Sequence, residues 1–178
     1  MTTIVLVHGA WGGSYSFGKL RPMLFSQGHE TFSPSLTGIG ERSHLIHPGI
    51  GLNTHINDVV NTVLYEDLND ILLLGFSYGG MVVTGALAQI ADRVKHLVYL
   101  DAFVPENGDS VKSISGMGRE RRQIDPHTSW LLAPAPRQLD SEEDTQWMEA
   151  RRSMQPLLSF TETVSLGQPL ESGSFSRC

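Results

Sequence analysis

One serine stands in a sequence context typical of a catalytic nucleophile. Ser77 is the centre of the pentapeptide G-F-S-Y-G, residues 75–79, which follows the apolar run 71–74 and precedes a second apolar stretch. In such a motif a sharp turn between a strand and a helix lifts the hydroxyl above the edge of a sheet, and the flanking glycines prevent a steric clash. The motif alone is weak evidence, but this context favours a nucleophile over an ordinary Gly-Ser turn.

A second motif, H-G-A-W-G-G at residues 8–13, follows the first apolar run of the chain. Acyl transfer requires preorganised backbone N–H groups that stabilise an oxyanion, each contributing about 3–4 kcal/mol. We expect one donor from Tyr78, the residue after the nucleophile, and the other from Ala10 in this loop. The imidazole of His8 is interpreted as a locally hydrogen-bonded group that holds the turn, while the backbone beside it carries the function.

Alternating strand and helix patterns are expected to position these two motifs. Short apolar runs indicate buried strands, and apolar residues near a period of 3.6 indicate helices. Strand–helix alternation at this spacing predicts right-handed βαβ units and a parallel sheet of the α/β class. The expected strands cover residues 4–7, 71–74 and 96–100, with another in HETFSPSL (29–36). The expected helices cover residues 17–27, 53–65, 78–90 and 141–154. An ordered loop is expected at residues 36–51.

Four segments together resemble the α/β-hydrolase superfamily, in the branch of plant hydroxynitrile lyases, plant methylesterases and related bacterial esterases. They are LVHGAWGG, SLTGIGERSHL, GFSYGGMV and HLVYLDAFVPENGDS, in this order and spacing. The resemblance is close from Ile4 to about Ser110 and looser to about Leu158. Most relatives carry a histidine before the nucleophile, and Phe76 departs from that pattern.

The resemblance implies a parallel-sheet α/β-hydrolase fold with a lid insertion, a nucleophile at Ser77, and an oxyanion hole from Ala10 and Tyr78. On this basis we expect a hydrolase core at 1–104, a lid or cap region at 105–158, and an irregular tail at 159–178.

The family order of the catalytic residues is serine, acid, then histidine. No strand-like run follows the lid, and the last histidine is His127, inside it. We therefore expect the last core strands and helices to be missing, with the tail as a truncation end. The free sheet edge that results would allow two copies to pair as a homodimer.

Three residues are weaker candidates for the missing catalytic partners. Asp101 ends the strand 96–100 and could orient a base, although a turn-capping role is favoured for it. His44 and His127 are candidate bases. The remaining histidines, at 29, 47, 55 and 96, are expected on the surface or in loops, and their spacing indicates neither a metal site nor a cofactor.

The leading functional prediction is a serine-dependent carboxylic-ester or lactone hydrolase that forms an acyl-enzyme at Ser77. One alternative is a catalytically impaired remnant or a small-molecule binder on the same scaffold, and another is a hydroxynitrile-type lyase. Glycines 9, 12 and 13 lack the order of a dinucleotide-binding loop. The candidates for the substrate pocket are Trp11, Phe76, Phe103 and Trp130.

Composition limits the classes of partner that we expect the protein to bind. A net charge of −6 argues against nucleic acid and anionic membrane surfaces as partners. The first apolar run, 4–7, is too short for a signal peptide or a membrane span, and the single cysteine, Cys178, excludes an intrachain disulfide. We expect a cytoplasmic protein that acts on a small-molecule ester or lactone.

Overall fold

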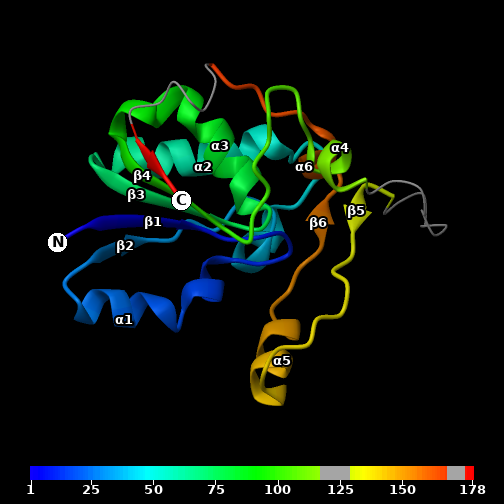
Figure 1. The fold of residues 1–178 in the computed structure, drawn as a ribbon. Coiled ribbons are helices and arrows are strands. Elements are labelled where there is room, and N and C mark those ends of the chain that lie inside the picture. Colours follow the sequence, from blue (N-terminus) through cyan, green and yellow to red (C-terminus); the bar gives the residue numbers. More distant parts are fainter. Residues whose placement is uncertain (117–128, 168–174) are drawn as a thin grey trace.

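The strands of the hydrolase-like core form a parallel sheet (Figure 1). The computed structural model describes residues 1–116, 129–167 and 175–178, and within these ranges the sheet has five strands. Their order across the sheet is β2 (Glu30–Phe32), β1 (Thr3–Val7), β3 (Ile71–Phe76), β4 (Val94–Leu100) and β7 (Ser176–Arg177). The four strands that were expected from apolar runs are all present, and the predicted α/β fold class is confirmed.

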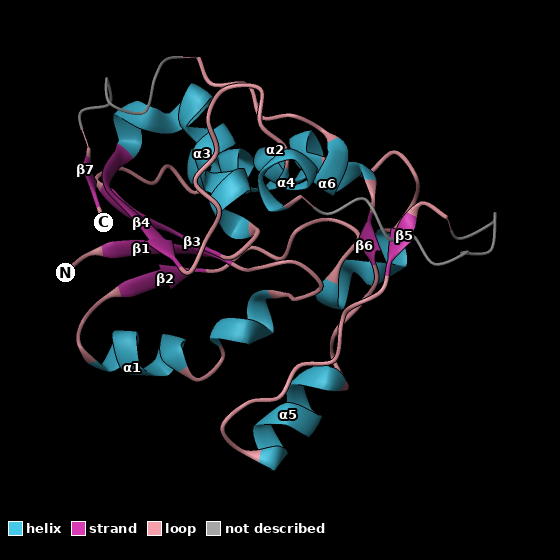
Figure 2. Ribbon diagram, turned by 45° about the vertical axis from the view of Figure 1, so that its right-hand side comes forward, coloured by secondary structure: helices cyan, strands magenta, loops and turns pink. Residues whose placement is uncertain are grey.

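Helices cover both faces of this sheet (Figure 2). α2 (Leu52–Tyr65) and α3 (Gly79–Ile90) lie side by side on one face, and α1 (Leu20–Ser26) lies on the other. The expected helix 17–27 is split, because a 3₁₀ turn, η1 (Ser14–Phe17), precedes α1. The expected ordered loop 36–51 contains another such turn, η2 (Gly40–Leu45), and η3 (Ala91–Arg93) follows α3.

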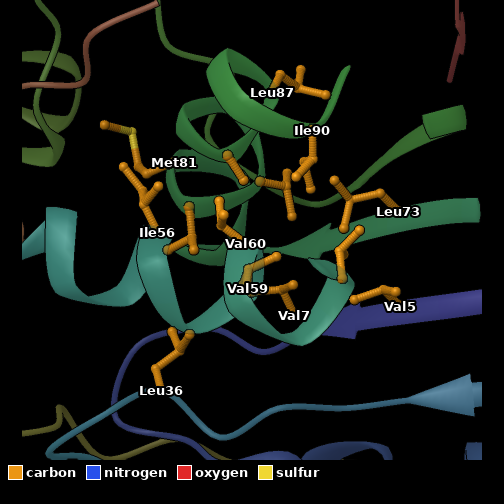
Figure 3. Packing of buried hydrophobic residues seen from close by; sticks show 14 of the residues in the cluster. Val5, Val7, Leu36, Ile56, Val59, Val60, Leu73, Met81, Leu87 and Ile90 are labelled. Carbon is orange, nitrogen blue, oxygen red and sulfur yellow. The ribbon is translucent and has the colours of Figure 1, made fainter. Parts of the chain in front are cut away.

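The larger core lies between the sheet and the pair α2 and α3 (Figure 3). Along β3, Ile71 and Leu73 are fully buried, whereas Leu72 and Leu74 on the opposite face are only half-buried. This alternation follows from the two-residue period of a strand, which points neighbouring side chains to opposite faces. The face that meets α2 and α3 therefore anchors the sheet, and the α1 face is more thinly covered.

Residues 129–161 lie near the carboxyl ends of the core strands (Figure 2), and Phe160 and Val164 pack in the larger core. Two short segments of the region pair antiparallel as β5 (Leu131–Leu132) and β6 (Gln155–Pro156), although residues 102–140 show no clear strand pattern in the sequence. Between them lies α5 (Glu142–Glu149), which is shorter than the expected helix 141–154 and whose N-cap Ser141 accepts a hydrogen bond from the Asp144 N–H. α4 (Val111–Ser115) and α6 (Leu158–Thr161) complete the region beside α2.

The end of the chain also differs from the irregular tail that we expected. Ser176 and Arg177 add a parallel strand to β4, and Cys178 exchanges backbone hydrogen bonds with Leu97 and Tyr99 at 3.0 and 2.9 Å. An unpaired strand edge presents free N–H and C=O groups, so even a weakly strand-forming segment can dock there. The expected free edge of β4 is therefore covered over this short stretch. Within the described ranges, every helix is too short or too polar to cross a lipid bilayer.

Candidate active site

Ser77 occupies the sharp turn between β3 and α3. Its backbone is left-handed, with φ of +53°, a conformation that few residues other than glycine adopt. Two hydrogen bonds hold the turn against the end of β4: the Ser77 N–H donates to the Leu100 carbonyl at 3.3 Å, and the Phe103 N–H donates to the Ser77 carbonyl at 3.1 Å. The strand–turn–helix context predicted for a nucleophile is thus present, and the Ser77 side chain is half-buried.

Close backbone approach explains one of the glycines in the motif. A Cβ atom placed on Gly79 would lie 2.9 Å from the carbonyl oxygen of His8 and 3.1 Å from the carbonyl carbon of Val7. Both contacts are with backbone atoms of the neighbouring strand, which cannot rotate away as a side chain would. Gly79 therefore allows the start of α3 to pack directly on the end of β1.

Two backbone N–H groups near Ser77 lack hydrogen-bond acceptors. Within the described residues, neither the Ala10 nor the Tyr78 N–H donates to a protein acceptor. Tyr78 is also the N-cap of α3, where the helix dipole favours negative charge. The loop that carries Ala10 packs tightly on the turn, because a Cβ on Gly9 would lie 3.1 Å from the Ser77 Cβ. Both predicted oxyanion donors therefore belong to the Ser77 turn or to the loop packed on it, and among the described residues neither has an acceptor.

Ser77 lines a cavity of about 350 Å³ between the sheet edge and the lid. Of the predicted pocket residues, Trp11 and Phe76 line this cavity, whereas Phe103 and Trp130, both among the described residues, lie outside its lining. The core contributes the rest of its wall from residues 9–12, 15–17 and 20, and from Leu100. The lid contributes Arg137, Leu139, Met148 and Arg152, which sequence reasoning missed because no local pattern marks them.

The candidate partners of Ser77 are not assembled around it. His44 is exposed on η2, and no histidine of the described residues lines the cavity. His127 lies outside the described residues. Asp101 follows β4 directly with a left-handed φ of +43°, but its side chain is exposed and also absent from the cavity lining. The described part of the site thus has the candidate nucleophile Ser77 and the two predicted oxyanion donors, and no described histidine lines the cavity beside them.

His8 is fully buried beneath the oxyanion loop and has a structural role, as its sequence context indicates. Its Nε2 accepts a hydrogen bond from the Leu36 N–H at 3.1 Å, so Nδ1 carries the proton and donates to the Gly9 carbonyl at 2.8 Å. Burial lowers the pKa of His8 to about 4, with partial opposition from the bond to Gly9. The imidazole is therefore neutral and ties the loop to the segment after β2.

His55 was expected on the surface or in a loop, which is wrong: it is fully buried on α2. Its Nε2 donates to the Thr37 carbonyl at 2.9 Å, and its Nδ1 accepts from the Tyr78 hydroxyl at 2.8 Å. Burial lowers the pKa of His55 to about 4 and raises the pKa of Tyr78, so both groups are neutral. His55 thereby fixes the side chain of the residue whose backbone N–H flanks Ser77.

These two histidines predict a specific pH dependence of stability. Each pKa falls from 6.5 to about 4 on folding, so the unfolded chain binds more protons between these pH values. The contribution of each neutral histidine to the free energy of unfolding is complete above pH ~6.5. It is lost as the pH falls towards 4, and it amounts to about 3 kcal/mol per group. We would measure the free energy of unfolding by urea titration at pH 7.5 and at pH 4.5. Between these two conditions it should fall by about 2 kcal/mol less in His55→Gln than in wild type. His44→Gln, at an exposed site, is the control, and parallel losses in wild type and His55→Gln would contradict the prediction.

Known proteins resemble this chain in sequence. The model of the Alpha/beta hydrolase family matches residues 4–172. The chain is 46% identical over 114 residues to the carbendazim hydrolyzing esterase of Nocardioides sp., covering 64% of this chain and 47% of that protein. It is 31% identical over 103 residues to the alpha-hydroxynitrile lyase of Arabidopsis thaliana, covering 57% of this chain and 40% of that protein. The chain thus spans about half the length of the curated relatives that it matches.

Solved structures agree at the level of the fold. Tomato methylketone synthase I, solved as a complex with 2-tridecanone, superposes with a TM-score of 0.77 at 18% identity, covering 99% of this chain and 76% of that one. The parallel sheet, the left-handed serine turn after β3 and the family match over residues 4–172 lead to one conclusion. This chain belongs to the alpha/beta hydrolase family.

Proposed function

We propose that the chain carries the nucleophile and the oxyanion hole of a serine-dependent carboxylic-ester or lactone hydrolase that reacts through an acyl-enzyme at Ser77. The observation that carries this proposal is the left-handed Ser77 turn, which lines a cavity together with Ala10, while the N–H groups of Ala10 and Tyr78 have no acceptor among the described residues. The similarity to an esterase over the core supports the same reaction class.

The steps follow from these groups. Ser77 Oγ attacks the carbonyl carbon of the ester while a base accepts its proton, and the carbonyl oxygen becomes an oxyanion. The N–H groups of Ala10 and Tyr78 donate to that oxyanion, the alcohol leaves, and water then hydrolyses the acyl-enzyme. The cavity wall is mostly apolar, with Trp11, Phe76 and Met148 among its residues, which suits an aromatic or aliphatic ester.

Deprotonation of Ser77 is the step for which the described residues offer no partner. We therefore expect a small base in solution to assist it: added imidazole should accelerate labelling of Ser77 by a fluorophosphonate by about tenfold or more, part of the ~10²–10⁴ that a positioned base contributes. The measurement is the labelling rate against imidazole concentration, with Ser77→Ala as the background.

The variant His127→Gln separates the possible results of this experiment. Acceleration by imidazole in both wild type and His127→Gln supports a nucleophile that lacks a nearby base. No acceleration, together with loss of labelling in His127→Gln, would identify His127 as the base and still support the hydrolase. If Ser77 resists labelling under every condition, the hydrolase proposal fails.

A second candidate function is binding of a small molecule without turnover. It is favoured by the same absence of a described histidine from the Ser77 cavity. In that case Ser77→Ala would bind an aromatic carboxylate as tightly as wild type, as measured by quenching of tryptophan fluorescence, and neither protein would hydrolyse its p-nitrophenyl ester. The lyase alternative has a different signature, the release of aldehyde from a cyanohydrin.

A further inference from the structure

We propose that Gln155, in the lid, is a positioning residue for the oxyanion loop: by holding the Trp11 N–H it fixes the peptide that follows Ala10, while the bond from His8 to the Gly9 carbonyl holds the peptide that carries the Ala10 N–H. The inference rests on the proposed function of Ala10. It means that the lid does more than cover the cavity, because one lid residue helps to build the reaction site.

Trp11 has the backbone of a residue that needs outside support. Its φ is +61°, in the left-handed region that large side chains rarely occupy, and it directly follows Ala10. Such conformations persist where the surrounding structure holds them in place. In this loop the support comes from residues more than 100 positions away in the sequence.

Three hydrogen bonds connect Trp11 with the lid. Its N–H donates to Gln155 Oε1 at 3.0 Å, its indole Nε1–H donates to the Leu132 carbonyl at 3.0 Å, and its carbonyl accepts from the Ser153 N–H at 3.1 Å. The indole also packs edge-on against Phe160, with ring centroids 5.6 Å apart. Of these contacts, only the bond to Gln155 is made by the N–H of the peptide that joins Ala10 to Trp11. This bond therefore fixes the plane of that peptide.

The amide of Gln155 has only one workable orientation. Gln155 is fully buried, and its Nε2 donates to Ser159 Oγ at 2.7 Å. Ser159 in turn uses its proton to donate to the Pro156 carbonyl at 2.6 Å, so its oxygen is an acceptor towards Gln155. This chain of donors forces Oε1 to face Trp11. A buried amide satisfied at both ends is rigid, which is what a positioning group requires.

The chain offers a matched pair of variants for a test. Gln155→Met keeps the length of the side chain but removes the acceptor of the Trp11 N–H. Ser153→Ala also removes one hydrogen bond between lid and core, the one from the Gly40 N–H to Ser153 Oγ at 2.8 Å, but leaves the contacts of Trp11 in place. A general loosening of the lid would affect both variants, whereas a specific effect on the loop would affect only the first.

We expect Gln155→Met to slow the labelling of Ser77 by a fluorophosphonate by roughly 10- to 100-fold, since a misplacement of about 1 Å at a reaction site costs on that order. Ser153→Ala should stay within about twofold of wild type, because it leaves the donors in place. With p-nitrophenyl acetate, Gln155→Met should lower kcat and leave KM nearly unchanged, as expected for a donor used only in the transition state.

A second variant keeps the proposal testable if Gln155→Met fails to fold. In Gln155→Glu, the protonated acid can accept from Trp11 and donate to Ser159, whereas the ionised form places a charge in a buried site and turns two acceptors towards each other. Its labelling rate relative to wild type should therefore rise as the pH falls through the raised pKa of the buried carboxyl group. A ratio independent of pH would contradict the proposed role of the amide.

A readout without reaction chemistry separates this inference from the proposed function. In the Ser77→Ala background, amide hydrogen exchange at Trp11 should be faster and the Ala10 amide resonance should shift with Gln155→Met, but not with Ser153→Ala. If wild type never labels while these amide effects occur, the hydrolase proposal fails and the coupling of lid and loop stands. If the amides of Ala10 and Trp11 respond equally to both variants, or to neither, the inference is overturned.

Discussion

Replacing Ser77 with alanine is expected to abolish covalent labelling by a fluorophosphonate and to reduce p-nitrophenyl ester turnover to the rate without protein. The reason is that Ser77 lines the cavity in a left-handed turn next to both proposed oxyanion donors, so an acyl group would be transferred to its Oγ. The measurement is intact-mass spectrometry of the labelled protein, followed by peptide mapping and an initial-rate assay.

Ser16 provides a matched control for this experiment, because it is a second serine whose residue lines the same cavity. It lies in the 3₁₀ turn η1, with ordinary helical backbone and no elbow geometry. Ser16→Ala should therefore label at a rate within about threefold of wild type, as a surface-like substitution away from the reacting atoms. Label on any residue other than Ser77, or equal labelling of Ser77→Ala and wild type, would disprove the assignment of the nucleophile.

Replacing Gly79 with alanine is expected to cause a large loss of stability. The new Cβ would meet the carbonyl groups of Val7 and His8, so β1 and α3 would have to move apart. Forcing an extra carbon into a well-packed core costs about 1–3 kcal/mol and occasionally more, and this clash is with backbone on both sides. We expect a loss of about 3 kcal/mol in the free energy of unfolding, measured by urea titration at pH 7.5.

Gly167→Ala is the control for the stability experiment. A Cβ at Gly167 would make ordinary van der Waals contacts with Ala88 at 3.8–3.9 Å, and its backbone is not left-handed. Its unfolding free energy should change by no more than about 0.5 kcal/mol. Similar losses in Gly79→Ala and Gly167→Ala would mean that the strand–helix contact tolerates expansion, and that the glycine in the motif is not required by packing.

The parts of the fold that the sequence predicts well are those with a local signal. β1, β3 and α3 are uninterrupted apolar segments, and α2 shows a stripe at Ile56, Val59, Val60 and Val63 that all pack in the core (Figure 3). The same stripe contains the signal that we missed for His55, which lies four residues before Val59 and so faces the core with it. A histidine was assigned to the surface by its residue type when its helical position indicated burial.

Other features leave no local trace in the sequence. β5 and β6 are two residues each, and the contacts of Trp11 with Leu132 and Gln155 span 121 and 144 positions. Such pairings depend on how the lid folds back over the sheet edge, which no window of the sequence encodes. The same reasoning applies to β7, where the unpaired edge of β4 selects a partner that has little strand propensity of its own.

Three residues other than glycine with left-handed backbones, Trp11, Ser77 and Asp101, lie at the carboxyl ends of three neighbouring strands. Each such residue costs folding stability relative to glycine, by roughly 1 kcal/mol or more. Selection for thermal tolerance alone would therefore favour glycine at all three positions and, at Ser77, would erase the hydroxyl. The carboxyl edge of the sheet thus holds strained residues where the chemistry is proposed to occur, so stabilised variants are better sought in the α2–α3 layer than around the cavity.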